Sequence, residues 1–381
     1  MAGDLGAVRG TGGGRFRAWV WLAGLILLGL PGPLAARPSQ AYLDLVARYA
    51  VGDRAEAVTA LGAWTEQALN IEVKALTNLV VKGEPCDNCP PLPELFRTAV
   101  MLHTDRASFE RGALSGSEQI ALECRDGVHA AVAEQVAALL LGETKGRIFA
   151  ERWYLAMALR AEGKACFREA IDWAERGLKW FPKDPQLLLA VGTAEEVLAS
   201  LRFPYLVRAW QSGSQQREAL ALSVERRARL DRARRSLQEA LVADPSLDEA
   251  RLRLGRVQWA VGQKEAASAS LQGVLAQSQD LRLLYLAHLF LGQIHEDAGR
   301  VPAAVAEYRA ALALDPAAQV AAVALALALD LGGDVAASRQ VLEAAVSRAR
   351  RQSGDIYWSY VEPGPDRAEA LLTALREETR R

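Results

Sequence analysis

The 381-residue sequence has no excess of charge of either sign, since 45 lysines and arginines balance 46 aspartates and glutamates. A nucleic-acid-binding domain would show a basic excess, so this balance argues against a nucleic-acid partner. Methionine (3) and phenylalanine (8) are scarce, and runs of β-branched residues are rare. Apolar residues still make up 51% of the chain, and abundant alanine and leucine favour helices around a sizeable core.

The motifs of common enzymes are also missing. The sequence contains no phosphate-binding loop, no G-x-S-x-G motif and no H-E-x-x-H motif. His103, Asp105 and Glu110 are close in the sequence, but nothing beside them offers the pocket and nucleophile that a catalytic dyad requires. We therefore predict a protein that is not an enzyme and needs no cofactor, with His103 on a helix surface or in the core.

Long apolar segments are absent after the N-terminus, where a membrane-spanning helix would need about 20 residues. The N-terminus itself has three arginines followed by 13 uninterrupted apolar residues, Ala18 to Leu30. This order is typical of a secretory signal peptide, which we assign to residues 1–36. An uncleaved membrane anchor and a buried helix of the folded domain are the alternatives. We predict export to a periplasm or cell envelope, with membrane association if the segment stays in place.

Small residues recur at fixed intervals in the C-terminal half. The stretch from Tyr285 to Pro316 carries Gly292, Gly299 and Ala304 within an otherwise helical pattern. Similar residues recur 37 positions upstream and 34 positions downstream. The upstream set is Leu254, Gly255, Gly262, Ala267 and Leu271, and the downstream set is Gly333, Ser338, Leu342 and Ala345.

A pair of antiparallel helices explains these positions. Gly292 and Ala304 would lie where the two helices touch, because only small side chains allow a close approach. Gly299 would end the first helix, and Pro316 would stop the second. One such pair cannot bury its own apolar face, so neighbouring pairs must stack. The pattern resembles the tetratricopeptide repeat, whose period is 34 residues, and implies an all-α fold, a right-handed α-solenoid.

The repeat pattern divides the chain into regions. We assign the solenoid to residues 151–350, where Ala170 and Gly177 mark an early unit. An insertion near 201–225 separates the two helices of the next unit. Residues 37–150 are predicted to form a divergent helical region that is only partly repeat-like.

Residues 351–381 have a different character, because glycines and prolines bracket an aromatic cluster. The cluster contains Tyr357, Trp358 and Tyr360, and a charged amphipathic helix follows over residues 366–380. A repeat array needs a terminal helix that covers its last apolar surface. We predict that this helix caps the last repeat, with the aromatic side chains packed beneath it.

The four cysteines allow several arrangements. Cys86 and Cys89 lie in a proline-rich stretch, EPCDNCPPLP, and in an exported protein the two can form a short-loop disulfide. A redox-active pair is an alternative, although the strand and helix context of a thioredoxin-like fold is absent. A zinc site is another, with candidate ligands Cys86, Cys89, Cys124 and either His103 or His129. Cys166, beside Phe167 in a helical pattern, is predicted to be a small buried residue.

Arginines crowd residues 217–235, but carboxylates stand at helical spacing from several of them. Glu225 precedes Arg229 by four positions, and Asp231 precedes Arg235 by four. Such pairs stabilise a solvated helix face. We prefer this interpretation, and a surface for an acidic partner or anionic lipid is the alternative.

In tetratricopeptide arrays, the first helix of each unit lines a concave face that commonly holds a peptide or helix of a partner. The resemblance therefore implies a groove of apolar residues and charges of both signs. The groove residues are Glu249, Leu252, Arg256, Trp259, Leu289, Gln293, Glu296, Val323 and Asp330. Trp259 is the candidate anchor, and core packing between helices is its alternative role. The set lacks the lysine-and-asparagine pattern by which some family members clamp a C-terminal carboxylate.

The sequence thus predicts a non-enzymatic interaction scaffold of a bacterial cell envelope, which binds a protein or peptide segment in its groove. An N-terminal metal- or disulfide-containing module with an enzymatic or redox role, using Cys86, Cys89 and His103, is a function of a different class. A third hypothesis is a structural subunit whose groove is filled permanently by its own chain or a paralogous one.

Overall fold

The computed structural model is built from helices and turns, and strands are absent from the residues that it describes. The predicted signal segment, residues 1–36, lies outside these residues, as do Cys86 and Cys89. The all-α prediction is confirmed for the described part of the chain. The described residues are 37–82, 91–109, 124, 128–201, 204, 207–208, 211, 216–349, 355–361, 364 and 366–380.

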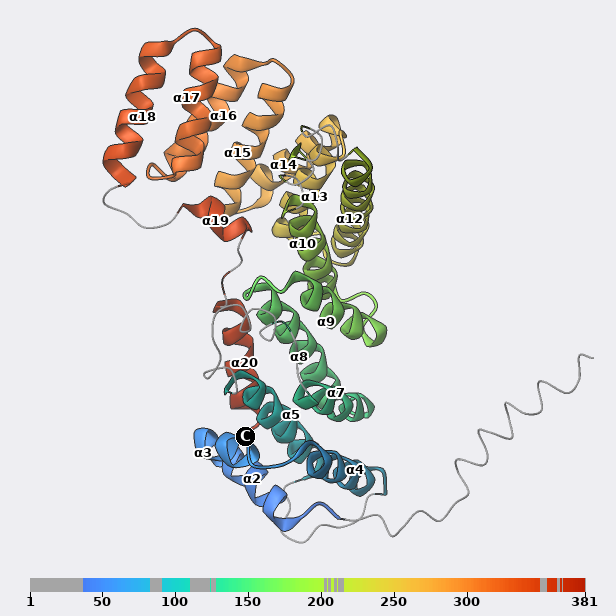
Figure 1. The fold of residues 1–381 in the computed structure, drawn as a ribbon. Helices are drawn as coiled ribbons and strands as arrows, with labels where there is room; N and C mark the ends of the chain where they lie inside the picture. The colour runs from blue at the N-terminus through green and yellow to red at the C-terminus, as the bar shows by residue number, and fades with distance from the viewer. Residues whose placement is uncertain are drawn as a thin grey trace, which may run out of the picture.

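The helices follow one another as hairpins along an elongated stack (Figure 1). The N-terminal part contains α2 (Gln40–Val51), α3 (Arg54–Leu61), α4 (Glu66–Lys82), α5 (Leu92–Phe109), α7 (Val128–Leu139), the short 3-10 helix η2 (Leu140–Gly142), α8 (Thr144–Glu162), α9 (Phe167–Trp180) and α10 (Pro185–Leu201). The C-terminal part contains α12 (Gln216–Ala243), α13 (Asp248–Ala260), α14 (Lys264–Gln277), α15 (Leu281–Asp297), α16 (Val301–Leu314), α17 (Gln319–Leu331), α18 (Val335–Ala349), α19 (Ile356–Val361) and α20 (Asp366–Glu378).

The small residues predicted at the helix contacts lie there. A Cβ atom added to Gly292 of α15 would be 2.3 Å from Cε1 of Tyr308 on α16, so no side chain fits at this position. Ala304 is fully buried in the same contact. Gly299 has a φ of 69°, a left-handed conformation that glycine adopts at little cost, and it separates the two helices. The interpretation of these three residues is confirmed.

The same hairpin packing is repeated along the stack. Within the described residues, α8 packs with α9, α10 with α12, α13 with α14 and α17 with α18. Gly192 of α10 lies against Leu237 of α12, where an added Cβ would be 2.6 Å from the leucine Cγ atom. The helices on either side of the insertion therefore form one unit, with α12 in the role of second helix.

The first helices of the units share one face of the stack, and the C-terminal segment runs back along it. α19 lies against α15, and α20 packs on α8 and α5 towards the opposite end (Figure 1). Leu372 and Leu375 of α20 are buried in the apolar cluster of the N-terminal half. The prediction that this helix caps the last repeat is therefore wrong.

The aromatic cluster also lies elsewhere than predicted. Tyr360 packs edge-on against Phe290 of α15, with ring centroids 5.2 Å apart, and is buried. Trp358 is 55% exposed. The aromatic residues thus attach the returning chain to the middle of the stack and do not pack beneath α20. The reason is that Phe290 and its neighbours offer an apolar surface on the shared face.

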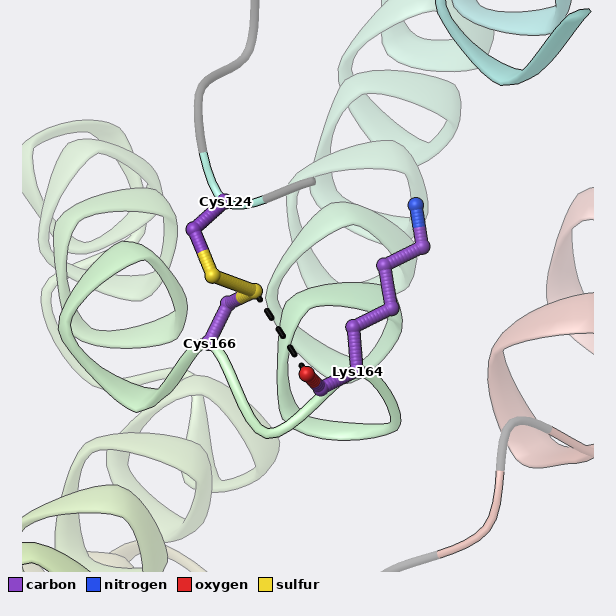
Figure 2. Close-up of a disulfide and its surroundings, with 3 residues drawn as sticks. All are labelled: Cys124, Lys164 and Cys166. Carbon is purple, nitrogen blue, oxygen red and sulfur yellow. Dashed lines mark hydrogen bonds between the residues drawn. A yellow bond between two sulfur atoms is a disulfide. The ribbon is translucent and has the colours of Figure 1, made fainter. Parts of the chain in front are cut away.

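A disulfide joins Cys124 to Cys166 (Figure 2). It connects a residue that precedes α7 to the turn between α8 and α9, with Cα atoms 5.3 Å apart. The carbonyl oxygen of Lys164 lies 3.5 Å from Cys166 Sγ, but a disulfide sulfur carries no proton to donate. Cys166 is buried as predicted, at 4% exposure, but its bond was not foreseen. The proposed use of Cys124 as a zinc ligand is wrong for this form, because its sulfur is already bonded.

Candidate functional site

The turn inside each repeat unit fixes a register along the shared face. In the turns from α8 to α9, α13 to α14, α15 to α16 and α17 to α18, the residues with positive φ are Ala165 (57°), Gly262 (86°), Gly299 (69°) and Gly333 (84°). The residues three positions before them are Glu162, Trp259, Glu296 and Asp330. Sequence reasoning found the last three but missed Glu162, because Gly163 was the obvious turn residue. Gly163 in fact has an ordinary helical φ of −62°, and the left-handed residue is Ala165.

Arg253 of α13 lies at the centre of the shared face. Its side chain is 1% exposed and donates from Nη1 to Glu196 (3.1 Å) and from Nε to Glu249 (3.2 Å). The third nitrogen, Nη2, donates to the carbonyl oxygen of Tyr360 (3.3 Å), whose hydroxyl donates to Glu196. We call these four residues the Arg253 network. It joins α10 and α13 to α19, and so fixes the returning chain.

The charges within the network determine the protonation states of Arg253 and Tyr360. Burial alone would lower the pKa of Arg253, but Tyr360 and the carboxylates of Glu249 and Glu196 raise it above its ordinary value. Burial and the charge of Glu196 raise the pKa of Tyr360 well above its usual range. Arg253 therefore remains a cation and Tyr360 a neutral hydrogen-bond donor across physiological pH.

The segment before α19 is held in a similar way. The carboxylate of Asp355 accepts hydrogen bonds from the hydroxyl of Tyr285 (3.3 Å) and from the backbone N–H of Val320 (2.7 Å). These contacts attach the segment to α15 and to the start of α17. The chain's own C-terminal segment thus fills part of the predicted groove, which the third sequence hypothesis had anticipated as one outcome.

Several predicted groove residues are buried in the core or bound to other side chains of the same chain. Leu252 and Leu289 are fully buried between helices, so their assignment to an open groove is wrong. The register alone could not tell which apolar side of each helix faces its neighbour. Glu249 is bound by Arg253 and by Arg282 of α15 (3.3 Å).

Other groove residues are partly open. Glu296 accepts a hydrogen bond from the hydroxyl of Tyr308 at 2.7 Å. Gln293 is half-buried, and Oε1 of its side chain has no hydrogen-bond partner. Val323 is 48% exposed and Asp330 is exposed as well, both on α17 beyond the reach of the Arg253 network.

Arg256 and Trp259 line an open cleft of about 500 Å³ beside the Arg253 network. The guanidinium carbon of Arg256 lies 4.6 Å from the centroid of the Trp259 ring. The indole N–H of Trp259 donates to Asp297 at 2.8 Å, which fixes the ring at the wall of the cleft. We call this hollow the Trp259 cleft, and its principal residues are Glu196, Arg226, Arg256, Trp259, Asp297 and Tyr357.

Two guanidinium groups face the Trp259 cleft. Burial, together with the positive charge of Arg256, lowers the pKa of Arg226 below its ordinary value. The carboxylates of the cleft are already engaged, Glu196 in the Arg253 network and Asp297 with Trp259. The cleft therefore places two guanidinium groups next to aromatic surface. Arg226 comes from the arginine-rich helix α12, whose Glu225–Arg229 pair forms as predicted (3.0 Å).

His103 and Asp105 of α5 have structural partners. His103 is fully buried, with Nε2 3.0 Å from the Tyr42 hydroxyl, which agrees with the predicted core position. Asp105 accepts hydrogen bonds from the hydroxyl of Tyr49 (2.5 Å) and from Arg376 of α20 (2.7 Å). Among the residues that the structure describes, no group of three His, Cys, Asp or Glu side chains is placed to hold a metal ion.

Comparison with known proteins identifies the repeats. Two overlapping stretches, residues 252–319 and 289–355, match the tetratricopeptide repeat family. The prediction made from the spacing of small residues is thereby confirmed. No curated protein matches the chain. Among the described residues, no helix has both the length and the apolar character that crossing a bilayer requires.

Solved structures that align with the chain include several of MamA. The structure of MamA 41-end from Desulfovibrio magneticus RS-1 is 19% identical, covers 54% of this chain and 97% of its own, and has a TM-score of 0.40. A second MamA crystal structure is 20% identical, covers 50% of this chain and 93% of its own, and has a TM-score of 0.38. Scores of this size support no argument about function.

Proposed function

We propose that this tetratricopeptide repeat protein is an exported, non-enzymatic interaction scaffold that binds an acidic segment of a partner protein in the Trp259 cleft. Repeat solenoids of this kind present extended surfaces to other proteins, and the matched repeats support that general role. The cleft lies where α13 and α15, two helices of the matched region, meet the returning chain.

Arg256 carries the proposal, and Arg226 lines the same cleft. Arg256 forms no ion pair within the described part of the chain, and its guanidinium group stacks on Trp259 and Phe290 instead. A guanidinium group binds carboxylates through paired hydrogen bonds, and stacking leaves its edge free to do so. Arg226 adds a second positive charge to the same space. An incoming aspartate or glutamate would therefore be favoured over a lysine or arginine.

Aromatic surface gives the cleft a second means of recognition. Trp259 is half-buried, and Tyr357 of α19 lines the same cleft. Aromatic side chains that are already fixed contribute strongly to interfaces, because they bury large area with little loss of conformational freedom. A partner segment that combines an acidic residue with an apolar or aromatic one fits these two features.

The disulfide supports the exported location. Disulfides persist in oxidising compartments such as a bacterial periplasm and are rare in reducing cytosol. The Cys124–Cys166 bond therefore adds to the signal-like pattern of residues 1–36. A place in a bacterial cell envelope, and any membrane association through an uncleaved N-terminal segment, are part of this proposal.

Selection from a displayed library of random peptides on the purified protein tests the binding role. We expect enriched peptides to carry aspartate or glutamate next to an apolar or aromatic residue. Arg256→Ala should weaken their binding by at least about tenfold, the effect of losing a charged hydrogen bond. Arg309→Ala removes an exposed arginine of α16 outside the cleft and is the matched control. Enrichment of basic peptides, or equal binding to Arg256→Ala, would contradict the proposal.

A further inference from the structure

A second, smaller cavity lies on the other side of the Arg253 network. Its volume is about 190 Å³, and side chains from α8, α10, α13, α15 and α20 line it. This volume is below the range of roughly 300–1,000 Å³ typical of pockets for drug-sized ligands. It equals the share of about six water molecules in the liquid, at ~30 Å³ each. The principal polar residues of the cavity are Glu162, Gln186, Thr193, Glu249, Arg282 and Arg367.

Glu162 is an unpartnered acid in this cavity. The residue is 4% exposed, and its Oε1 atom is buried with no hydrogen-bond partner. Native proteins rarely leave a buried polar atom unsatisfied, because its lost hydration is not replaced. The carboxyl group lies at the register position that carries Trp259 and Glu296 in later units, on the face where repeats contact their ligands. Oε1 of Glu162 is therefore open to a hydrogen-bond partner that the described residues do not supply.

The other carboxylate of the cavity already has its partners. Glu249 accepts from Arg253 and Arg282, and these two arginines lower its pKa although burial alone would raise it. Arg253 in turn uses all three of its nitrogens within the network. Glu162 is thus the one acidic group that faces the cavity without a donor among the residues that the structure describes.

Two further arginines, Arg282 and Arg367, line the same cavity. Arg282 is partly exposed, at 29% of its side chain, and Arg367 is exposed while donating to Gln186 at 2.5 Å. Guanidinium groups favour a carboxylate, whereas an ionised acid favours a cation. The cavity therefore holds groups that can bind both charges of a small zwitterion.

We propose that the cavity binds a free amino acid, with the ligand's ammonium group on Glu162 and its carboxylate towards Arg282 and Arg367. The ammonium group donates the hydrogen bonds that Oε1 of Glu162 lacks. The carboxylate accepts further hydrogen bonds from the two arginines. Since the returning chain closes one side of the cavity through α20, the ligand also bridges the solenoid to its own C-terminal helix.

Ligand binding is coupled to proton release. Burial raises the pKa of Glu162 to about 8, with Arg253 and Arg367 opposing this shift and Glu249 adding to it. Arg282 reaches the cavity from α15, and the polar side chains that α10 contributes, Gln186 and Thr193, carry no charge. Glu162 is therefore mostly protonated at pH 7 in the empty cavity, and an ammonium ion favours its ionised form. Affinity should rise between pH 6 and pH 8, as the cost of removing the proton falls.

Isothermal titration of the purified protein with each of the common free amino acids tests the proposal. We expect at least one to bind with one-to-one stoichiometry. Titrations at pH 7 in buffers of different ionisation enthalpy should show release of close to one proton. The same amino acid with an acetylated amine, or with an amidated carboxyl group, should bind at least about tenfold more weakly, since each removes one charged contact.

Matched variants separate this site from the Trp259 cleft. Glu162→Gln has the shape of the neutral acid, so it should fold normally, bind at least about tenfold more weakly and release no proton. Glu265→Gln, an exposed change on α14, should leave binding unaltered, as should Arg256→Ala in the Trp259 cleft. Failure of all amino acids to bind at millimolar concentration would overturn the proposal. Equal binding by Glu162→Gln, or by an amine that has no carboxylate, would do the same.

Discussion

The two ends of the solenoid differ in how their apolar faces are covered. At the N-terminal end, α20 lies across α8 and α5 and buries Leu372 and Leu375. At the C-terminal end, α17 and α18 leave large apolar side chains exposed, including Leu327 (56%) and Val346 (55%). Both ends are built from the same kind of helical hairpin. The difference shows that a capping helix need not lie on the repeat that precedes it in the sequence.

Polar complementarity explains the position of α20. Asp105 of α5 is only 10% exposed at its side chain and would be costly to bury without a cation. Arg376 of α20 supplies it through hydrogen bonds of 2.7 and 3.0 Å, and the hydroxyl of Tyr49 adds a third. The helix is thus specified by a buried ionic contact as well as by its leucines. This combination favours the N-terminal end as its position.

The largest expected loss of stability is at the N-terminal end, which α20 covers. Leu375→Ala should lower the free energy of unfolding by about 2–5 kcal/mol, because it removes a fully buried side chain and leaves a cavity. Leu342→Ala on the open face of α18, where the side chain is 40% exposed, should cost only about 0.5 kcal/mol. Urea unfolding measures the free energy of unfolding of both variants, so the two losses can be compared. Equal losses would mean that α20 does not cover the N-terminal end in solution.

Loss of the disulfide, also in the N-terminal half, should lower the free energy of unfolding almost as much. Replacing Cys124 and Cys166 together by serine removes a link between residues 42 apart in the chain. The expected loss is about 2–4 kcal/mol, since the unfolded chain is no longer constrained. Hydrogen exchange should rise in α8 and α9 and stay unchanged in α15 to α18. The double variant is better than a reducing agent, because it leaves Cys86 and Cys89 as they are.

A smaller effect is expected at a helix contact of the open end. Gly292→Ala forces a Cβ atom against the Tyr308 ring and should cost about 1–3 kcal/mol. Gly142→Ala is the control, because nothing lies within 4 Å of its added Cβ. Thermal melting of the two variants is sufficient. An unchanged melting temperature for Gly292→Ala would show that α15 and α16 pack less closely than described.

Glu162→Gln, between the covered and open regions, is expected to change the stability least when the variant and the wild type are compared at acidic pH. The pKa of this carboxyl is about 8 in the folded protein against an ordinary value of 4.5. The native state therefore keeps a proton that the unfolded chain releases, and stability should fall as pH rises from 4.5 to 8. The variant should match the wild type near pH 4.5 and lose less stability at pH 8. If the melting temperatures of the variant and the wild type changed with pH in the same way across this range, Glu162 would not be a buried carboxyl with a raised pKa.

The repeat units could be predicted because their contacts are local. Gly292 meets Tyr308 within one hairpin, so the spacing of these two residues in the sequence specifies the close approach. The candidate site was harder to predict from the sequence. Trp259 and Arg256 were found from the register, whereas Glu162 was missed because an alanine, Ala165, takes the left-handed turn position.

The hairpins and their stacking follow from local sequence, because small residues, helix-ending glycines and apolar faces act between neighbours in the chain. Tertiary structure alone decided where the C-terminal helix lies and which cysteines pair. Arg376 meets Asp105 across 271 residues, and Cys124 meets Cys166 across 42. Contacts over such distances depend on which buried charge or thiol the folded stack brings within reach, and no periodicity in the sequence records that.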